Sequence, residues 1–141
     1  MFYLKISAGL FGLLGIINLT YGLKCPKISP CISPEDKSLR KEIDIAVKNH
    51  TVTVFSRTTC PFSKRVKAIL RDNYHIKDLF IVEIDLHENM CGMLDCLNAE
   101  SGIHTVPQVF VSGKFLGNHD IIKKLFESGL LDEILIDAKA I

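Results

Sequence analysis

Apolar residues in the middle of the chain change from a strand pattern to a helix pattern within one short stretch. Val52, Val54 and Phe55 bring the β-branched and aromatic character that favours a strand. Further along, apolar residues fall on one side of a helix, at Val66, Ala68, Ile69 and Leu70. The stretch from Thr51 to Lys67 therefore predicts a strand, a tight turn and a helix that begins at Cys60.

The segment before this stretch also has helical spacing. Its apolar positions are Leu39, Ile43, Ala46 and Val47, and we expect them to pack on a sheet. This helix is predicted to start near Ser33–Pro34, because a proline followed by acidic residues is typical of a first helical turn.

A second strand is predicted after the Cys60 helix. The apolar run at residues 79–85 is short and nearly continuous, which favours a buried strand. Because a strand, a helix and a strand follow one another, we expect the two strands to be parallel, with a right-handed crossover.

The C-terminal part predicts two helical regions around a hairpin. Residues 90–100 are expected to form a helix that ends at Gly102. Short strands at residues 108–111 and 115–116 flank a turn over residues 112–114. Helical spacing returns from Asp120 onward, with a break at Gly129.

Residues 1–23 differ from the rest of the chain in composition. Lys5 is the only charged side chain, and residues 6–23 are almost wholly apolar, which predicts a signal peptide or a membrane anchor. Small residues at Thr20 and Gly22 would permit cleavage after Gly22, and a buried first helix is the alternative. We therefore expect the protein to enter the secretory pathway, whether it stays in the ER or Golgi lumen, is anchored to a membrane or is secreted.

A short proline-rich stretch separates this segment from the remainder. Residues 24–34 contain three prolines and predict an extended linker, so that a single domain spans residues 35–141. The whole chain has 141 residues and a formal net charge of +1. That length suits one domain with a hydrophobic core, and the near-neutral charge gives no reason to expect a nucleic-acid partner.

The five cysteines suggest one reactive thiol and up to two disulfides. We expect a bridge between Cys25 and Cys31. A bridge between Cys91 and Cys96 would need an irregular turn, because residues five apart point away from each other on a continuous helix. Unpaired thiols are the alternative for all four. A glycosylation sequon at Asn49-His50-Thr51 would be used only in the secretory pathway.

Cys60 is the candidate nucleophile. The first N–H groups of a helix have no partner within the helix, and the helix dipole places about half a positive charge there. These groups favour the thiolate, which is the reactive form of cysteine. Pro61 is tolerated in the first turn, and Arg57, Lys64 and Arg65 add positive charge nearby.

Three motifs with this spacing give the chain a strong resemblance to the glutaredoxin family from about residue 35 to the end. They are R-T-T-C-P-F-S at residues 57–63, T-V-P at residues 105–107 and G-K-F-L-G-N-H-D at residues 113–120. The resemblance implies an α/β, thioredoxin-like fold, with a central mixed four-stranded sheet flanked by helices. It also implies a glutathione-binding site.

The resemblance implies that several residues hold glutathione. Pro107 corresponds to the family's cis-proline, and this geometry would expose the backbone of Thr105 and Val106 to pair with the tripeptide like an added strand. Arg57 stands at the family's usual lysine position and would pair with a glutathione carboxylate. Phe62 replaces a more usual tyrosine and would shield the wall of the site.

The turn before the last helical region would bind the other end of glutathione. Asp120 would accept a hydrogen bond from the γ-glutamyl ammonium, or would only cap the helix. Asn118 stands where the family usually has a second glycine, and it tolerates the left-handed conformation. His119 replaces a small residue and would add a pH-sensitive contact or lie beside the site without a role.

Ser63 replaces the resolving cysteine of dithiol relatives, so the resemblance implies a monothiol route. Ser63 would hydrogen-bond to the thiolate, and Cys60 would exchange with glutathionylated proteins or small disulfides. The first alternative is a module that binds a [2Fe–2S] cluster between two copies, each supplying Cys60 and a glutathione. The second is a thioredoxin-like binding domain without turnover. We expect a monomer, or a dimer if a cluster is bound.

Overall fold

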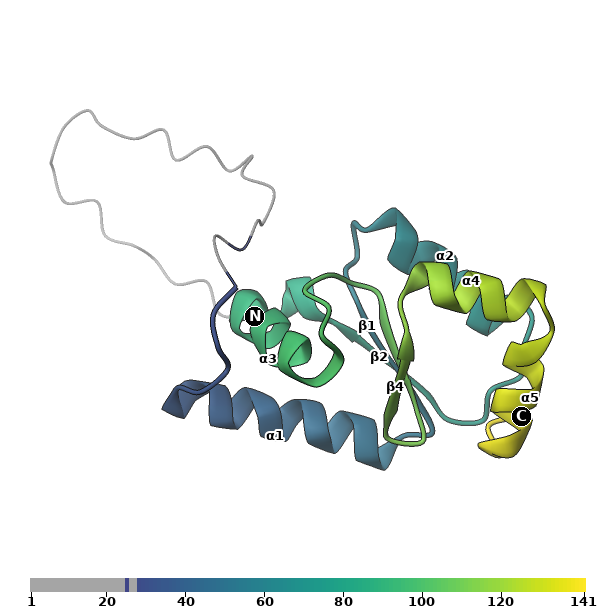
Figure 1. Ribbon diagram of the computed structural model, residues 1–141, viewed down its shortest axis with the longest axis horizontal. Coiled ribbons are helices and arrows are strands. Elements are labelled where there is room, and N and C mark those ends of the chain that lie inside the picture. The colour runs from purple at the N-terminus through teal and green to yellow at the C-terminus, as the bar shows by residue number, and fades with distance from the viewer. Residues whose placement is uncertain (1–24, 26–27) are drawn as a thin grey trace, which may run out of the picture.

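The computed structural model describes residue 25 and residues 28–141 (Figure 1). In chain order the elements are α1 (Pro34–Asn49), β1 (Val52–Ser56), α2 (Pro61–Asp72), β2 (Leu79–Glu83), the 3₁₀ turn η1 (Ile84–Leu86), α3 (Met90–Ser101), β3 (Gln108–Val111), β4 (Lys114–Gly117), α4 (His119–Glu127) and α5 (Leu130–Asp137). The predicted signal peptide or anchor lies outside the described residues. No helix in the described part of the chain has both the length and the apolar character to cross a membrane.

The four strands form one mixed sheet in the order β2-β1-β3-β4. Strand β1 pairs with β2 in parallel, and β3 pairs antiparallel with both β1 and β4. This confirms the predicted strand–helix–strand unit and the hairpin. The buried strand predicted over residues 79–85 is wrong in two respects. Strand β2 is a partly exposed edge strand that ends at Glu83, and the chain then turns through η1.

Helices cover both faces of the sheet, as Figure 1 shows, and alternate residues of β1 pack against different helices. Phe55 points into the core under α1 and α3, where it meets Phe110 edge to face at 5.6 Å between ring centroids. Val52 and Val54 point into the other core, which α2, α4 and α5 complete. The central strands β1 and β3 are therefore buried on both faces, and the loops at their ends can form a site.

Helix α1 begins where the sequence predicts. Ser33 is its N-cap, with its Oγ accepting the N–H of Asp36 at 3.1 Å, while the Asp36 carboxylate accepts the N–H of Ser33. Pro34 occupies the first turn, where no N–H is needed. This reciprocal cap fixes the point at which the proline-rich stretch becomes a helix.

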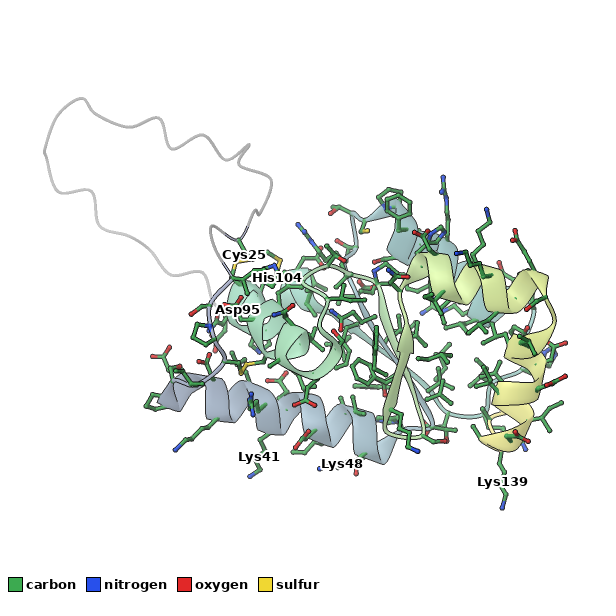
Figure 2. The ribbon with its side chains drawn as sticks, viewed as in Figure 1. Cys25, Lys41, Lys48, Asp95, His104 and Lys139 are labelled. Atoms are coloured by element: carbon green, nitrogen blue, oxygen red, sulfur yellow. A yellow bond between two sulfur atoms is a disulfide. The ribbon has the colours of Figure 1, made fainter. Side chains whose placement is uncertain are left out.

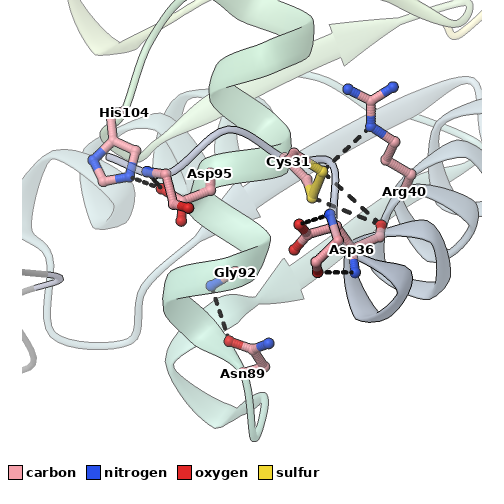
Figure 3. Close-up of a disulfide and its surroundings, with 10 residues drawn as sticks. Cys31, Asp36, Arg40, Asn89, Gly92, Asp95 and His104 are labelled. Atoms are coloured by element: carbon pink, nitrogen blue, oxygen red, sulfur yellow. Dashed lines mark hydrogen bonds and ion pairs between the residues drawn. A yellow bond between two sulfur atoms is a disulfide. The ribbon is translucent and has the colours of Figure 1, made fainter. Parts of the chain in front are cut away.

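Two disulfides attach the N-terminal segment (residues 25 and 28–33) to α3. They join Cys25 to Cys91 and Cys31 to Cys96. The expected Cys25–Cys31 bridge is therefore wrong, and neither a Cys91–Cys96 bridge nor four unpaired thiols is found. Because α3 is continuous, Cys91 and Cys96 lie on different sides of it and each needs a partner from another segment. Figure 2 marks Cys25 beside α3, and Figure 3 shows the buried Cys31 bridge.

Candidate active site

Cys60 lies where the turn after β1 becomes α2, as the sequence predicts. It is the N-cap residue of α2, and its carbonyl accepts the N–H of Lys64 at 3.1 Å. Its thiol is partly exposed and lies 3.7 Å from the carbonyl oxygen of Val106. The other four cysteines are all in disulfides, so Cys60 carries the one free thiol among the described residues.

Ser63 supports the turn that presents Cys60. Its side chain is fully buried, and its Oγ accepts the backbone N–H of Arg57 at 3.3 Å. The N–H of Cys60 in turn donates to the Arg57 carbonyl at 3.1 Å. Ser63 therefore holds the backbone three residues before the nucleophile, and the predicted bond from Ser63 to the thiolate stays a prediction.

Asp85, in η1 directly after β2, anchors the same turn, and the sequence analysis did not identify it. Its carboxylate accepts the N–H of Thr58 at 3.0 and 3.1 Å and also the Thr58 hydroxyl. Burial alone would raise the pKa of Asp85, but these bonds and the charge of Arg57 hold it below its usual value. The sequence feature that could have identified Asp85 is its place as an acidic residue at the carboxyl end of a strand expected to lie parallel to β1.

The loop across from Cys60 contains the predicted cis peptide bond, between Val106 and Pro107. The buried side chain of Gln108 fixes this loop. Its Nε2 donates to the carbonyls of Ile103 at 2.7 Å and Thr105 at 2.9 Å. These two bonds hold backbone that lies outside any helix or strand, immediately before the residue whose carbonyl faces the thiol.

A groove beside Cys60 has a volume of about 270 Å³. The residues that line it come from α2, the cis-proline loop and the start of α4, and they are Phe62, Thr105, Val106, Pro107, Asn118, His119 and Asp120. All seven were predicted to bind glutathione. The eighth predicted residue, Arg57, lies in the turn before Cys60 and is not part of the groove lining, so its pairing with a carboxylate stays a prediction.

The wall of the groove at α4 differs from the expectation in two details. Helix α4 starts at His119, and Asn118 rather than Asp120 is its N-cap, with Asn118 Oδ1 accepting the N–H of Ile121 at 3.2 Å. Asn118 has extended backbone, so it does not use the left-handed conformation. The position in this turn that requires a glycine is Gly117, because a Cβ there would lie 2.6 Å from the Cβ of Ile121.

His119 lies in the groove wall, and its predicted contact with glutathione stays a prediction. Its side chain is 12% exposed, its ring centroid lies 5.0 Å from that of Phe62, and its Nδ1 lies 2.9 Å from the Asp120 carboxylate. The Arg65 guanidinium lies over the same Phe62 ring, 5.6 Å from its centroid. Because Asn118 caps α4, the Asp120 carboxylate is not needed as a helix cap. Its side chain is 76% exposed, so the carboxylate can contact a ligand at the mouth of the groove.

Of the described residues, Cys31, Asp36 and Cys96 bring potential metal-ligating atoms within 4.8 Å of one another. The two sulfurs are joined in a disulfide, so this group does not offer thiolates to a metal.

The fold and site together define a class of protein. A thioredoxin-like sheet places a partly exposed cysteine at a helix N-terminus, opposite a cis-proline and beside a groove. This is the arrangement of a thiol-dependent oxidoreductase.

Comparisons with known proteins agree with this class. Residues 52–116 match the family model for glutaredoxin. A monothiol glutaredoxin of Caenorhabditis elegans is 46% identical over 110 residues, covering 76% of this chain and 75% of the relative. Glutaredoxin-C8 of Oryza sativa is 42% identical over 94 residues, covering 66% of this chain and 69% of the relative. The chain therefore belongs to the glutaredoxin family.

Solved structures extend the similarity to three dimensions. The crystal structure of oxidized glutaredoxin 2 from Chlamydomonas reinhardtii has a TM-score of 0.69 and 32% identity, covering 74% of this chain and 97% of that chain. The crystal structure of a buckwheat glutaredoxin–glutathione complex also has a TM-score of 0.69, with 28% identity, covering 74% of this chain and 94% of that chain. The thioredoxin-like fold is confirmed.

Proposed function

We propose that the chain is a monothiol, glutathione-dependent thiol–disulfide oxidoreductase that removes glutathione from mixed disulfides through Cys60. The observation that carries this proposal is the position of the Cys60 sulfur, 3.7 Å from the Val106 carbonyl at the edge of the groove. An extended peptide that pairs with the Val106 backbone would present its own cysteine to this sulfur. Glutathione binding by the buckwheat relative supports the same ligand.

The other groove residues suit the remaining parts of glutathione. The exposed Asp120 carboxylate would accept the γ-glutamyl ammonium, and the first N–H groups of α4 would face the adjacent carboxylate. The rings of Phe62 and His119 would form the wall between that end and Cys60. This assignment leaves the chemistry to one sulfur and the recognition to the groove.

The reaction proceeds by two thiol–disulfide exchanges. In the first, the Cys60 thiolate attacks the glutathione sulfur of the mixed disulfide, the substrate's S–S bond breaks, and the departing thiolate takes a proton from water. In the second, the thiolate of another glutathione attacks the sulfur now bonded to Cys60, releasing oxidised glutathione and the Cys60 thiolate. Ser63 cannot form a disulfide, so a second glutathione must complete the cycle.

The two disulfides support a secretory-pathway location, which we propose for the chain. Disulfides between buried cysteines persist in oxidising compartments and are rare in the cytosol. The exposed side chain of Asn49, in its sequon, is compatible with the same location.

The test is a coupled assay on the full chain. A glutathionylated peptide is supplied with glutathione and glutathione reductase, and NADPH oxidation is followed for the wild type and for Cys60→Ser. We expect turnover in the wild type and at least a 100-fold loss in Cys60→Ser, because no other thiol lies at the groove. Turnover retained by Cys60→Ser would refute the assignment of the nucleophile.

The visible spectrum of the same protein separates the alternatives. A coloured, dimeric protein with little turnover would indicate that Cys60 ligates an iron–sulfur cluster, a role that one partly exposed free thiolate per chain also suits. A colourless protein that binds glutathione without turnover would indicate a binding domain.

A further inference from the structure

The cis-proline loop has a second support besides Gln108, and it connects the loop to the disulfide-bonded N-terminal segment. His104 directly precedes Thr105 and Val106, and its Nε2 lies 2.8 Å from Oδ1 of Asp95 on α3. Figure 2 shows Asp95, His104 and Cys25 gathered at one corner of the molecule, and Figure 3 shows the ion pair beside α3. The groove does not include either residue.

Asp95 is held from two sides. Its Oδ1 accepts the backbone N–H of Ser29 at 3.1 Å as well as the His104 ring. Ser29 lies between Cys25 and Cys31, whose partners Cys91 and Cys96 are on either side of Asp95 in sequence. The N-terminal segment is therefore bonded to α3 next to the carboxylate, and the donors to that carboxylate come from two separate parts of the chain.

The pair is well shielded from water. The side chains of His104 and Asp95 are 18% and 10% exposed. A carboxylate only accepts hydrogen bonds, so the imidazole Nε2 must carry the proton that the pair shares. Bonds to a charged partner are stronger than neutral ones, and they weaken when water has access to the pair. The N-terminal segment reaches this shielded pair through the N–H of Ser29, which donates to the Asp95 carboxylate.

His104 is connected to the carbonyl that faces Cys60 by two residues of backbone. From His104 the chain passes through Thr105 to Val106, whose carbonyl faces the Cys60 sulfur at 3.7 Å. This stretch lies outside any helix or strand, so side-chain bonds set its position. Gln108 fixes the carbonyls of Ile103 and Thr105, and the Asp95 bond fixes the side chain of the residue between them.

We propose that Asp95 and His104 are positioning residues for glutathione, which hold the Val106 backbone in register with Cys60 under the cover of the disulfide-bonded N-terminal segment. This inference rests on the proposed function, because it assigns the pair a role in binding the same ligand. Neither residue touches the reacting sulfur, so their loss should weaken binding and leave the exchange step intact.

The experiment measures KM for the glutathionylated peptide and kcat separately, on the full chain at fixed glutathione. His104→Phe keeps a ring and removes the donor, and we expect KM to rise about fivefold, or about 1 kcal/mol at 1.4 kcal/mol per tenfold change. We expect kcat to stay within about twofold of the wild-type value. His104→Gln is the matched control, because its amide nitrogen can replace Nε2 as the donor, and it should restore KM to within about twofold.

A second variant guards against loss of folding in the first. Asp95→Asn keeps the size of the side chain and removes its charge, and it should raise KM in the same direction. Combined with His104→Phe, it should add nothing to the KM of His104→Phe alone, because without the His104 donor the charge of Asp95 no longer acts on the loop.

The possible results distinguish the positioning role from the proposed function on which it rests. Unchanged KM in Asp95→Asn and His104→Phe, with an active wild type, would overturn the positioning role alone. A fall in kcat with KM unchanged would do the same. An inactive wild type would overturn both the role and the proposed function.

Discussion

The two disulfides should stabilise the fold in a non-additive way, and the structure gives the size of the effect. Each closes a long loop, with sequence separations of 66 and 65 residues. In the chain-entropy description, either bridge alone stabilises the protein by about 4 kcal/mol. Once one bridge is closed, however, the second bridge closes only a short ring, because Cys31 follows Cys25 by six positions and Cys96 follows Cys91 by five.

A ring of roughly 11 residues contributes only about 3 kcal/mol. Removing one disulfide should therefore lower the free energy of unfolding by about 3 kcal/mol, whichever bridge is chosen, because the other still closes the long loop. Removing both should cost about 7 kcal/mol, so that the second removal costs more than the first.

The assay is equilibrium unfolding in urea, monitored by circular dichroism. Three variants are compared in a Cys60→Ser background, which removes the free thiol and prevents exchange. They are Cys25→Ala with Cys91→Ala, Cys31→Ala with Cys96→Ala, and all four substitutions together. Cys60→Ser alone is the reference.

Simple additivity would refute this reasoning, as would a four-alanine variant no less stable than either two-alanine variant. Complete unfolding of the four-alanine variant in buffer, with both two-alanine variants still folded, would agree with it. The pairing itself is checked by mass spectrometry of peptides from the unreduced protein, which should contain Cys25 linked to Cys91.

Three further predictions concern other parts of the molecule. Hydrogen bonds from Thr58 hold the pKa of Asp85 below the usual 3.8, so the ionised carboxylate stabilises the fold above about pH 4 and this stabilisation is lost as the pH falls further. Urea unfolding from pH 7 to pH 3 should show a smaller fall in the free energy of unfolding for Asp85→Asn than for the wild type. Gly117→Ala should cost about 1–3 kcal/mol, seen as a lower Tm, because its Cβ would overlap Ile121; an unchanged Tm would show that α4 shifts freely. In secretory cells, peptide N-glycosidase should increase the gel mobility of the wild type and leave Asn49→Gln unchanged, whereas an unaffected wild type would show that the sequon is unused.

Local sequence patterns predicted most of the elements because each follows from residues close together in the chain. The cap at Ser33, the strand before Cys60 and the hairpin around Gly113 all depend on neighbours within a few positions. The same holds for the groove. Its residues lie in three short motifs, and the family resemblance supplied the distances between them.

Contacts between distant segments were not predictable in this way. Cys25 and Cys31 are close in sequence, which favoured a local bridge, but the packing of α1 against α3 brings more distant partners to them. The anchoring role of Asp85 depends on the parallel register that places β2 beside β1. The hydrogen bond between Asp95 and Ser29 likewise depends on where the N-terminal segment crosses α3.

The order of the cysteines along the chain has a consequence for biosynthesis. As the chain emerges from the ribosome, Cys25 and Cys31 appear first, and their native partners follow only after more than sixty further residues have been made. In the interval the thiols within reach of each are the other member of the early pair and then Cys60, and any bond among these three is non-native. In the oxidising compartment proposed above, forming the native pairs would require oxidation delayed until α3 has emerged, or exchange of the early bonds by another thiolate.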